Sequence, residues 1–365
     1  MITTTQSSAH GRTIPDIAAE ILRQRDAKQD YLVEGNNLRM FQLEEATPAL
    51  RFSEFAYALG DIAHSQLAAI LEIPANYYNR MKDEAPELLA VNVNHWLDEV
   101  GPQRKMIRTL DGKARAILSD RYKIVDHDAI FGEVMGYLND AKATIRSSDI
   151  TEKKLYIRAI FPVEGEVKRG QVVRAGVQIT NSEVGMGAVS CQAWTEVLTC
   201  LNGAVMVSEQ MTTRSLHLGG GYAMDGNDPR LFATDTIAAD AKAISLKTRD
   251  IIRQCSDPKL FDAMLKQMRE GSERMVEPVG VAGVVTVLPR EIGLTKAEAV
   301  SSLNYFVQGG DLSQWGLANS VTRLAQDAKD FDRRVELETV GGKLINMTVK
   351  EFSSLSDQLV KAGSN

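Results

Sequence analysis

The sequence predicts an α+β fold in which a central antiparallel sheet lies between an N-terminal and a C-terminal helical part. Apolar residues recur at helical spacing toward both ends of the chain and alternate with polar residues in the middle. An Asp-Gly pair at 111–112 separates two alternating runs and predicts a β-hairpin. We therefore expect a mainly helical region over 1–100, a basic hairpin and sheet over 101–230, and a helical region over 231–365.

The composition excludes several classes of protein. Hydrophobic residues make up 44% and charged residues 25% of the 365 residues, which rules out a mainly disordered chain. No run reaches the roughly 18 apolar residues that indicate a membrane-spanning helix. The first residues lack the charged start and apolar core of a secretory signal. We expect a cytoplasmic protein without a membrane partner.

The first hundred residues combine helix and strand signals. Thr13 and Asp16 have the spacing of a helix capping box, and apolar residues follow at helical spacing. The pattern over 31–41 predicts two short strands, and the pattern over 53–98 predicts helices that are divided at two prolines.

Part of that helical stretch, HSQLAAILEIPANYYNRM, has the outline of a helix-turn-helix. Glu72 stands where the turn usually contains Gly. Tyr77, Tyr78 and Met81 suit a packed helix face. We therefore favour simple helix packing over DNA reading by this unit.

The clearest local structure is the hairpin KMIRTL-DG-KARAIL. A two-residue turn sets a register in which Arg108 lies opposite Arg115, and in which Ala116 and Leu118 share the face of Ile107. Like charges opposite each other on a sheet are unfavourable, on a scale of about 0.2–1 kcal/mol. A bound phosphate, or a carboxylate from elsewhere in the fold, has to offset them.

The rest of the chain predicts a helix over 127–138, several strands within 153–206, and helices from Thr234 onward. Two Thr-x-x-Glu capping boxes mark helix starts in that last region. The segment VGGK at 340–343 predicts a turn.

No pattern indicates a catalytic residue, a cofactor or a bound metal. None of the five histidines forms a metal-binding motif. Cys191, Cys200 and Cys255 are too sparse for a disulfide framework or a zinc site, and we expect buried free thiols. The Asp-His-Asp run at 126–128 precedes a predicted helix, so helix capping is its expected role.

One group of carboxylates near the C-terminus has the composition of a Mg²⁺ site. The group consists of Asp330, Asp332, Glu336 and Glu338. Arg333 and Arg334 lie between these residues, which favours an ion-paired surface instead.

Charge is unevenly distributed along the chain. Residues 101–180 hold 15 Lys and Arg against 10 Asp and Glu, while the whole chain carries −6 and the remainder therefore −11. The densest basic stretch, 104–123, has seven basic and two acidic residues. Such a stretch in an acidic chain is a candidate anion-binding surface.

Several segments together resemble a known family. They are RAILSDRY at 115–122, NSEVG at 181–185, LTCLNG at 198–203, WGLANSVT at 315–322, and a turn from Leu337-Glu338 to Gly341-Gly342. In this order they resemble the uncharacterised phage/plasmid-like proteins, over roughly residues 100–345. The resemblance implies an origin in a mobile element and a bacterial cytoplasm, and it brings no established activity.

A looser resemblance concerns the order of elements. A basic hairpin, a helix, a sheet and then helices is similar to phage single-strand annealing proteins of the RecT-like and Erf-like groups. Those proteins oligomerise around DNA, so the resemblance implies a homo-oligomer that takes part in recombination.

The leading hypothesis is a non-enzymatic protein that binds or anneals single-stranded DNA. Tyr122 and Tyr156 would stack on bases, and the cations would contact phosphates. The expected contact residues are Arg108, Lys113, Arg115, Arg121, Tyr122, Lys123, Lys153, Lys154, Tyr156 and Arg158.

Two alternatives stay open. The acidic remainder of the chain suits a protein that competes for a basic partner and so inhibits a host defence or replication protein. The second alternative is a metal-dependent nuclease that uses the carboxylates between Asp330 and Glu338.

Overall fold

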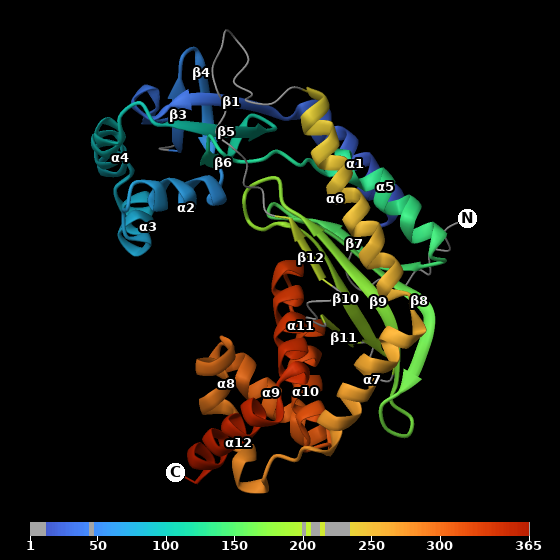
Figure 1. The fold of residues 1–365 in the computed structure, drawn as a ribbon. Coiled ribbons are helices and arrows are strands. Elements are labelled where there is room, and N and C mark those ends of the chain that lie inside the picture. Colours follow the sequence, from blue (N-terminus) through green and yellow to red (C-terminus); the bar gives the residue numbers. More distant parts are fainter. Residues whose placement is uncertain (1–11, 44–46, 199–201, 206–211, 216–233, 365) are drawn as a thin grey trace.

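The fold is α+β with helical parts toward both ends, as the sequence predicts, and it contains two sheets (Figure 1). The computed structural model describes residues 12–43, 47–198, 202–205, 212–215 and 234–364. One sheet belongs to the N-terminal part of the chain, and the other occupies the middle of the molecule.

The first sheet incorporates the hairpin. Its strands are β1 (Gln29–Glu34), β2 (Arg39–Gln42), β3 (Pro48–Phe52), β4 (Phe55–Leu59), β5 (Arg104–Leu110) and β6 (Lys113–Ser119). They lie in the order β1-β5-β6-β4-β3-β2, and only the β4–β6 pair is parallel. The hairpin therefore belongs with the N-terminal strands, whereas the sequence placed it with the central sheet.

Three helices pack against this sheet: α2 (Asp61–Ile70), α3 (Ala75–Glu84) and α4 (Pro86–Val100). Leu67, Tyr78 and Leu89 bring one residue from each helix into a core shared with Leu50 of the sheet. The helical prediction for 53–98 is wrong over β4. A short apolar run such as FAYAL fits a strand or a helix equally well, and pairing with β3 decides it.

The second sheet contains the predicted central strands and two that the sequence did not reveal, β7 and β12. Its members are β7 (Thr144–Ile150), β8 (Leu155–Glu166), β9 (Val172–Asn181), β10 (Val189–Val197), β11 (Asn202–Val205) and β12 (Thr212–Ser215). The order is β11-β10-β9-β8-β7, all antiparallel, with β12 also paired to β10.

Helices cover both faces of the second sheet. On one face lie α1 (Ile14–Ala27), α5 (His127–Asp140) and α6 (Thr234–Cys255), side by side (Figure 1). Their apolar residues, such as Ile17 and Val134, join Ile157 and Val177 in the largest core. The opposite face carries polar strand residues and meets helix α11.

The C-terminal part consists of helices. They are α7 (Pro258–Glu273), α8 (Val284–Ile292), α9 (Lys296–Gly309), α10 (Gln314–Asp327), α11 (Phe331–Asn346) and α12 (Val349–Gly363), with a short 3-10 turn at Pro278–Val281. A similar turn, Gly35–Asn37, joins β1 to β2 in the first sheet. The capping boxes at Thr13, Thr295 and Thr348 all form as predicted.

The predicted VGGK turn is wrong, because 340–343 lies inside α11. A Cβ added to Gly341 would lie 2.1 Å from Cγ2 of Thr322 on α10. The glycine therefore serves close packing between two helices.

Two further expectations concern cysteines and membranes. Cys191 and Cys255 are buried and free, while Cys200 lies outside the described residues. Within the described ranges, no helix combines the length and the apolar character required to cross a bilayer.

Candidate functional site

The hairpin does not place Arg108 opposite Arg115. Asp111 and Gly112 both have positive φ, which gives the predicted tight turn, and Thr109 pairs with Ala114 as expected. A bulge then shifts the register, so that Arg108 pairs with Ala116. Arg115 is the extra residue of the bulge. The predicted assignment of hairpin side chains to the two faces of the sheet is therefore wrong beyond the bulge.

Arg108 is fully buried and bonded to the protein itself. Its Nε and Nη2 atoms donate to the two carboxylate oxygens of Asp30 at 2.8 and 2.9 Å. Nη2 also donates to Asp126 at 2.7 Å, and Nη1 donates to the carbonyl oxygen of Glu183 at 2.8 Å. Burial by itself lowers the pKa of Arg108, but Asp126 and Asp30 outweigh it and raise the pKa above its ordinary value. Carboxylates of the protein itself therefore supply the negative charge that the arginines of the hairpin were predicted to need.

Arg115 has a similar partner. Its Nη2 donates to Oε2 of Glu183 at 2.7 Å, and Glu183 is itself buried. Burial raises the pKa of that carboxyl, but His127, Arg115 and Lys28 outweigh it, so the pKa lies well below its usual range. Glu183 is therefore ionised inside the protein.

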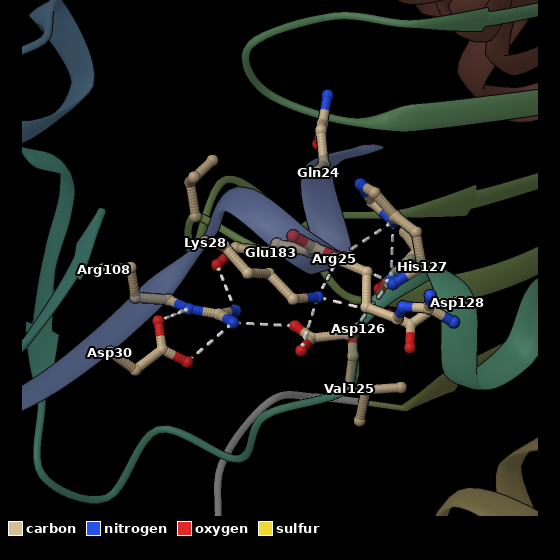
Figure 2. A network of polar contacts seen from close by, with 12 residues as sticks. Gln24, Arg25, Lys28, Asp30, Arg108, Val125, Asp126, His127, Asp128 and Glu183 are labelled. Atoms are coloured by element: carbon tan, nitrogen blue, oxygen red, sulfur yellow. Dashed lines mark hydrogen bonds and ion pairs between the residues drawn. The ribbon is translucent and has the colours of Figure 1, made fainter. Parts of the chain in front are cut away.

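Lys28 completes the network that Figure 2 shows. Its ammonium lies 2.7 Å from Asp126, 3.2 Å from Asp128 and 3.4 Å from Glu183 (Figure 2). Oxygens of these three carboxylates lie within 4.8 Å of one another, a spacing that would suit a cation. The cation among them is Lys28, which makes the cluster a structural ion network. We refer to Lys28, Asp30, Arg108, Arg115, Asp126, Asp128 and Glu183 as the junction network.

The Asp-His-Asp run has a different role from the expected one. Asp126 occupies the N-cap position of α5, but its side chain makes no capping bond. Glu183 replaces it, because its Oε1 accepts the backbone N–H of His127 at 2.7 Å. The ring of His127 is buried, and its Nδ1 accepts a bond from Nδ2 of Asn181 at 3.0 Å. Burial lowers the pKa of His127 to about 4, so the ring is neutral at pH 7.

Three more expected contact residues lie inside the protein. Tyr122 donates its hydroxyl to the carbonyl of Ser182. Tyr156 donates to Asp332, and Arg158 pairs with Glu338 in the layer between the second sheet and α11. Tyr122, Tyr156 and Arg158 are each at least 94% buried, as Arg108 is, and none of these four can contact DNA as expected. Both tyrosines are therefore unable to stack on bases.

The remaining expected cations reach the surface at two places. Lys113 and Arg115 line a cavity of about 340 Å³ beside the hairpin turn. Arg12 and Arg23 line it too, but so do four acidic residues: Glu20, Asp61, Asp111 and Glu152. The mixed charge gives this cavity no clear preference for an anion.

The second place surrounds the loop 182–187, between β9 and β10. Ser182 accepts the Tyr122 hydroxyl at its carbonyl and donates its own hydroxyl to the carbonyl of Lys153 at 2.7 Å. The loop thus joins the segment around Tyr122 to the turn between β7 and β8. We call the at least partly exposed cations of these segments the loop-182 surface: Arg121, Lys123, Lys153 and Lys154.

The carboxylates of the nuclease alternative are bonded to the protein. Asp330 caps α11, and Asp332 accepts from Tyr156. Glu336 pairs with Arg333, and Glu338 pairs with the buried Arg158. In the described part of the chain, the one group of carboxylates with metal-site spacing is the trio around Lys28.

Sequence reasoning missed Lys28, Asp30 and Glu183. One signal was present: two segments that carry the family resemblance, RAILSDRY and NSEVG, touch in the structure. Arg115 pairs with Glu183, and Tyr122 bonds Ser182. Comparisons of the chain with family models, curated proteins and solved structures found no match.

Replacing Arg108 by Ala should lower the free energy of unfolding by about 3–5 kcal/mol, because it leaves Asp30 and Asp126 without their buried partner. Urea denaturation measures the effect. The control Arg25→Ala removes an exposed pair with Asp26 and should cost less than about 1 kcal/mol. Equal effects of the two substitutions would contradict a structural role for the network.

Stability should fall on mild acidification. The folded chain keeps His127 neutral down to about pH 4, whereas the unfolded chain protonates it near its ordinary pKa of 6.5. The part of the free energy of unfolding that depends on a neutral His127 is fully present above pH 6.5. About 2 kcal/mol of it should be lost by pH 5. His64, whose pKa burial also lowers to about 4, acts in the same direction.

Urea denaturation at pH 7 and pH 5 tests this dependence in the wild type and in His127→Gln. The variant should show a smaller loss of stability on acidification. An unchanged loss would mean that His127 is not the titrating group.

Proposed function

We propose that the protein is a non-enzymatic DNA-binding protein of a bacterial mobile element, acting in the cytoplasm, and that it holds the sugar-phosphate backbone on the loop-182 surface. The observation that carries this proposal is that two cation-bearing segments both bond Ser182 of one loop: the segment with Arg121 and Lys123, through Tyr122, and the turn with Lys153 and Lys154. Lysine and arginine contacts to phosphates supply most of the sequence-independent affinity for nucleic acid.

The four cations of this surface lie at least partly in solvent. Tyr122 points inward, and its neighbours Arg121 and Lys123 reach at least partly into solvent. The Lys153 ammonium lies 3.7 Å from Asp332, and its side chain is 40% exposed. The Asp332 carboxylate is 9% exposed, so the pair is half-buried, but the 3.7 Å separation exceeds a hydrogen bond and leaves the Lys153 ammonium accessible to a phosphate.

Stacking of Tyr122 and Tyr156 on bases was the proposed reason for a preference for single-stranded DNA. Both side chains are buried, so this reason no longer applies. The order of hairpin β5–β6, helix α5, sheet β7–β10 and helix α6 still favours an annealing role and a homo-oligomer, by analogy with phage annealing proteins. Backbone binding is the part of the proposal that rests on named residues.

Replacing all four loop-182 cations by Ala should weaken binding to a labelled oligonucleotide by at least about tenfold at low salt. It should also reduce the slope of log affinity against log salt by about 3–4, since each lost phosphate contact removes about one unit. Electrophoretic shifts with single- and double-stranded probes at several salt concentrations give both quantities.

The matched control removes four exposed cations from α6, α7 and α8: Arg253, Lys259, Lys266 and Arg290. It changes net charge equally and should retain binding. If the control loses as much affinity, the effect is one of net charge and the assigned site is wrong.

A protein-interaction factor remains the second candidate, because α3 and α4 expose apolar side chains. Tyr77, Leu88, Val91 and Trp96 are 43–68% exposed, and Val91 is the most exposed of them. Exposed apolar and aromatic side chains are enriched in protein interfaces. The proposed partner is a basic, DNA-binding host protein, for which this acidic chain would compete with DNA.

Val91→Glu should abolish capture of such a partner from a nuclease-treated host lysate without changing the melting temperature. Val349→Glu, at another exposed valine, is the control. Capture that survives Val91→Glu would exclude this face.

A further inference from the structure

We infer that α2 and α3 form a helix-turn-helix that reads base sequence in the major groove of duplex DNA, through the outer face of α3. This goes beyond backbone binding, since it assigns base recognition and uses a different surface. In Figure 1, α3 lies at the outer edge of the N-terminal part, away from the second sheet.

The turn has the backbone that the motif requires. Four residues separate Ile70, the end of α2, from Ala75, the start of α3. Glu72 has a φ of +54°, and Ile73 N–H donates to the carbonyl of Ala68 at 2.9 Å. A positive φ and a hydrogen bond of this kind mark a helix C-terminus at which glycine is the usual residue. Glu72 adopts the conformation despite its side chain, so its presence is no argument against the motif.

The two helices are fixed relative to each other by a shared core. Leu67 and Ile73 on one side pack with Tyr78 and Met81 of α3. Nδ1 of His64 lies 2.8 Å from the Tyr78 hydroxyl, which adds a buried hydrogen bond between the helices. Helix α4 supports them as a third helix in the same core. A rigid helix pair of this kind can present α3 to a groove without rearrangement.

The face of α3 opposite this core is polar and free to bind. Asn76, Asn79, Arg80 and Asp83 follow the i, i+3, i+4, i+7 spacing of one helix face, and all four are exposed. Tyr77, which the sequence assigned to a packed face, is exposed beside them.

The side chains on this face are those that read bases. An asparagine side chain can form hydrogen bonds to N6 and N7 of adenine at the same time, and an arginine side chain can do so to O6 and N7 of guanine. Within the described ranges, no partner holds the side-chain amide of Asn76 or Asn79. Among the residues that the structure describes, Arg80 bonds Glu84 alone, in a pair that is 73% and 65% exposed.

The charge distribution along α3 matches the expected docking. In this motif the N-terminal residues of the second helix contact base edges. The N-terminal residues 75–80 contain no acidic residue, whereas Asp83 and Glu84 lie at the C-terminal end. The acidic end would therefore lie away from the bases.

Helix α2 also connects this unit to the loop-182 surface. Nε2 of Gln66 donates to the carbonyl of Val184 at 2.8 Å, and Ile62 packs against the cluster that contains Tyr122. Loop 182–187, which joins the segments that carry those cations, therefore lies against the helix that precedes α3. We expect the cations to hold flanking phosphates, although base reading by α3 does not depend on them.

The test is a selection from a random duplex DNA library with the full chain. We expect an enriched sequence motif. Asn76→Ala, Asn79→Ala and Arg80→Ala should each reduce affinity for the enriched duplex by about tenfold or more, with little effect on random duplex, because each removes one base contact. Asn304→Ala and Arg290→Ala, at exposed positions on α9 and α8, are matched controls that should change neither affinity.

Two results would overturn the inference: no enriched duplex, or an enriched duplex whose affinity the three α3 variants leave unchanged. All three positions are exposed, and thermal melting verifies that the variants fold. The loop-182 variant separates the two proposals, because it should weaken binding to enriched and random duplex alike. If only that variant has no effect, backbone binding at loop 182 fails and base reading by α3 stands.

Discussion

The hydrogen bonds of the buried Arg108 guanidinium fix the two sheets relative to each other. Arg108 lies on β5 of the first sheet and bonds Asp126, before α5, and the carbonyl of Glu183, after β9. The sheets share no described strand, so this network and its apolar surroundings form their junction. A buried ion pair adds little net stability, but it tolerates few alternative arrangements, since each would leave a charge without a partner.

The junction network also explains why the basic hairpin is a poor site for a polyanion. Three cations, Lys28, Arg108 and Arg115, face four carboxylates within one network. Their charge is already balanced, and the carboxylates would repel an approaching phosphate. Any binding of nucleic acid therefore has to use cations outside the network.

The two surfaces that we propose for DNA meet at α2. Gln66 and Ile62 turn one side of this helix toward loop 182–187, while Leu67 anchors the other side in the core beneath α3. The proposed backbone-binding surface thus lies beside the helix that precedes the proposed base-reading helix. The junction network includes Glu183 of this loop and joins it to Arg108 and Arg115 of the hairpin.

The sequence by itself determined the features that depend on residues a few positions apart: the capping boxes at Thr13, Thr295 and Thr348, and the turn at Asp111-Gly112. The two-residue period of a β-strand also places Tyr156 and Arg158 of β8 on one face of the sheet. Only the tertiary structure decided what covers that face, which residues neutralise Arg108, and that Gly341 belongs in a helix. Asp30 is 78 residues from Arg108, and Glu183 is 75. Contacts at such separations depend on how whole elements pack, and local patterns carry no information about that.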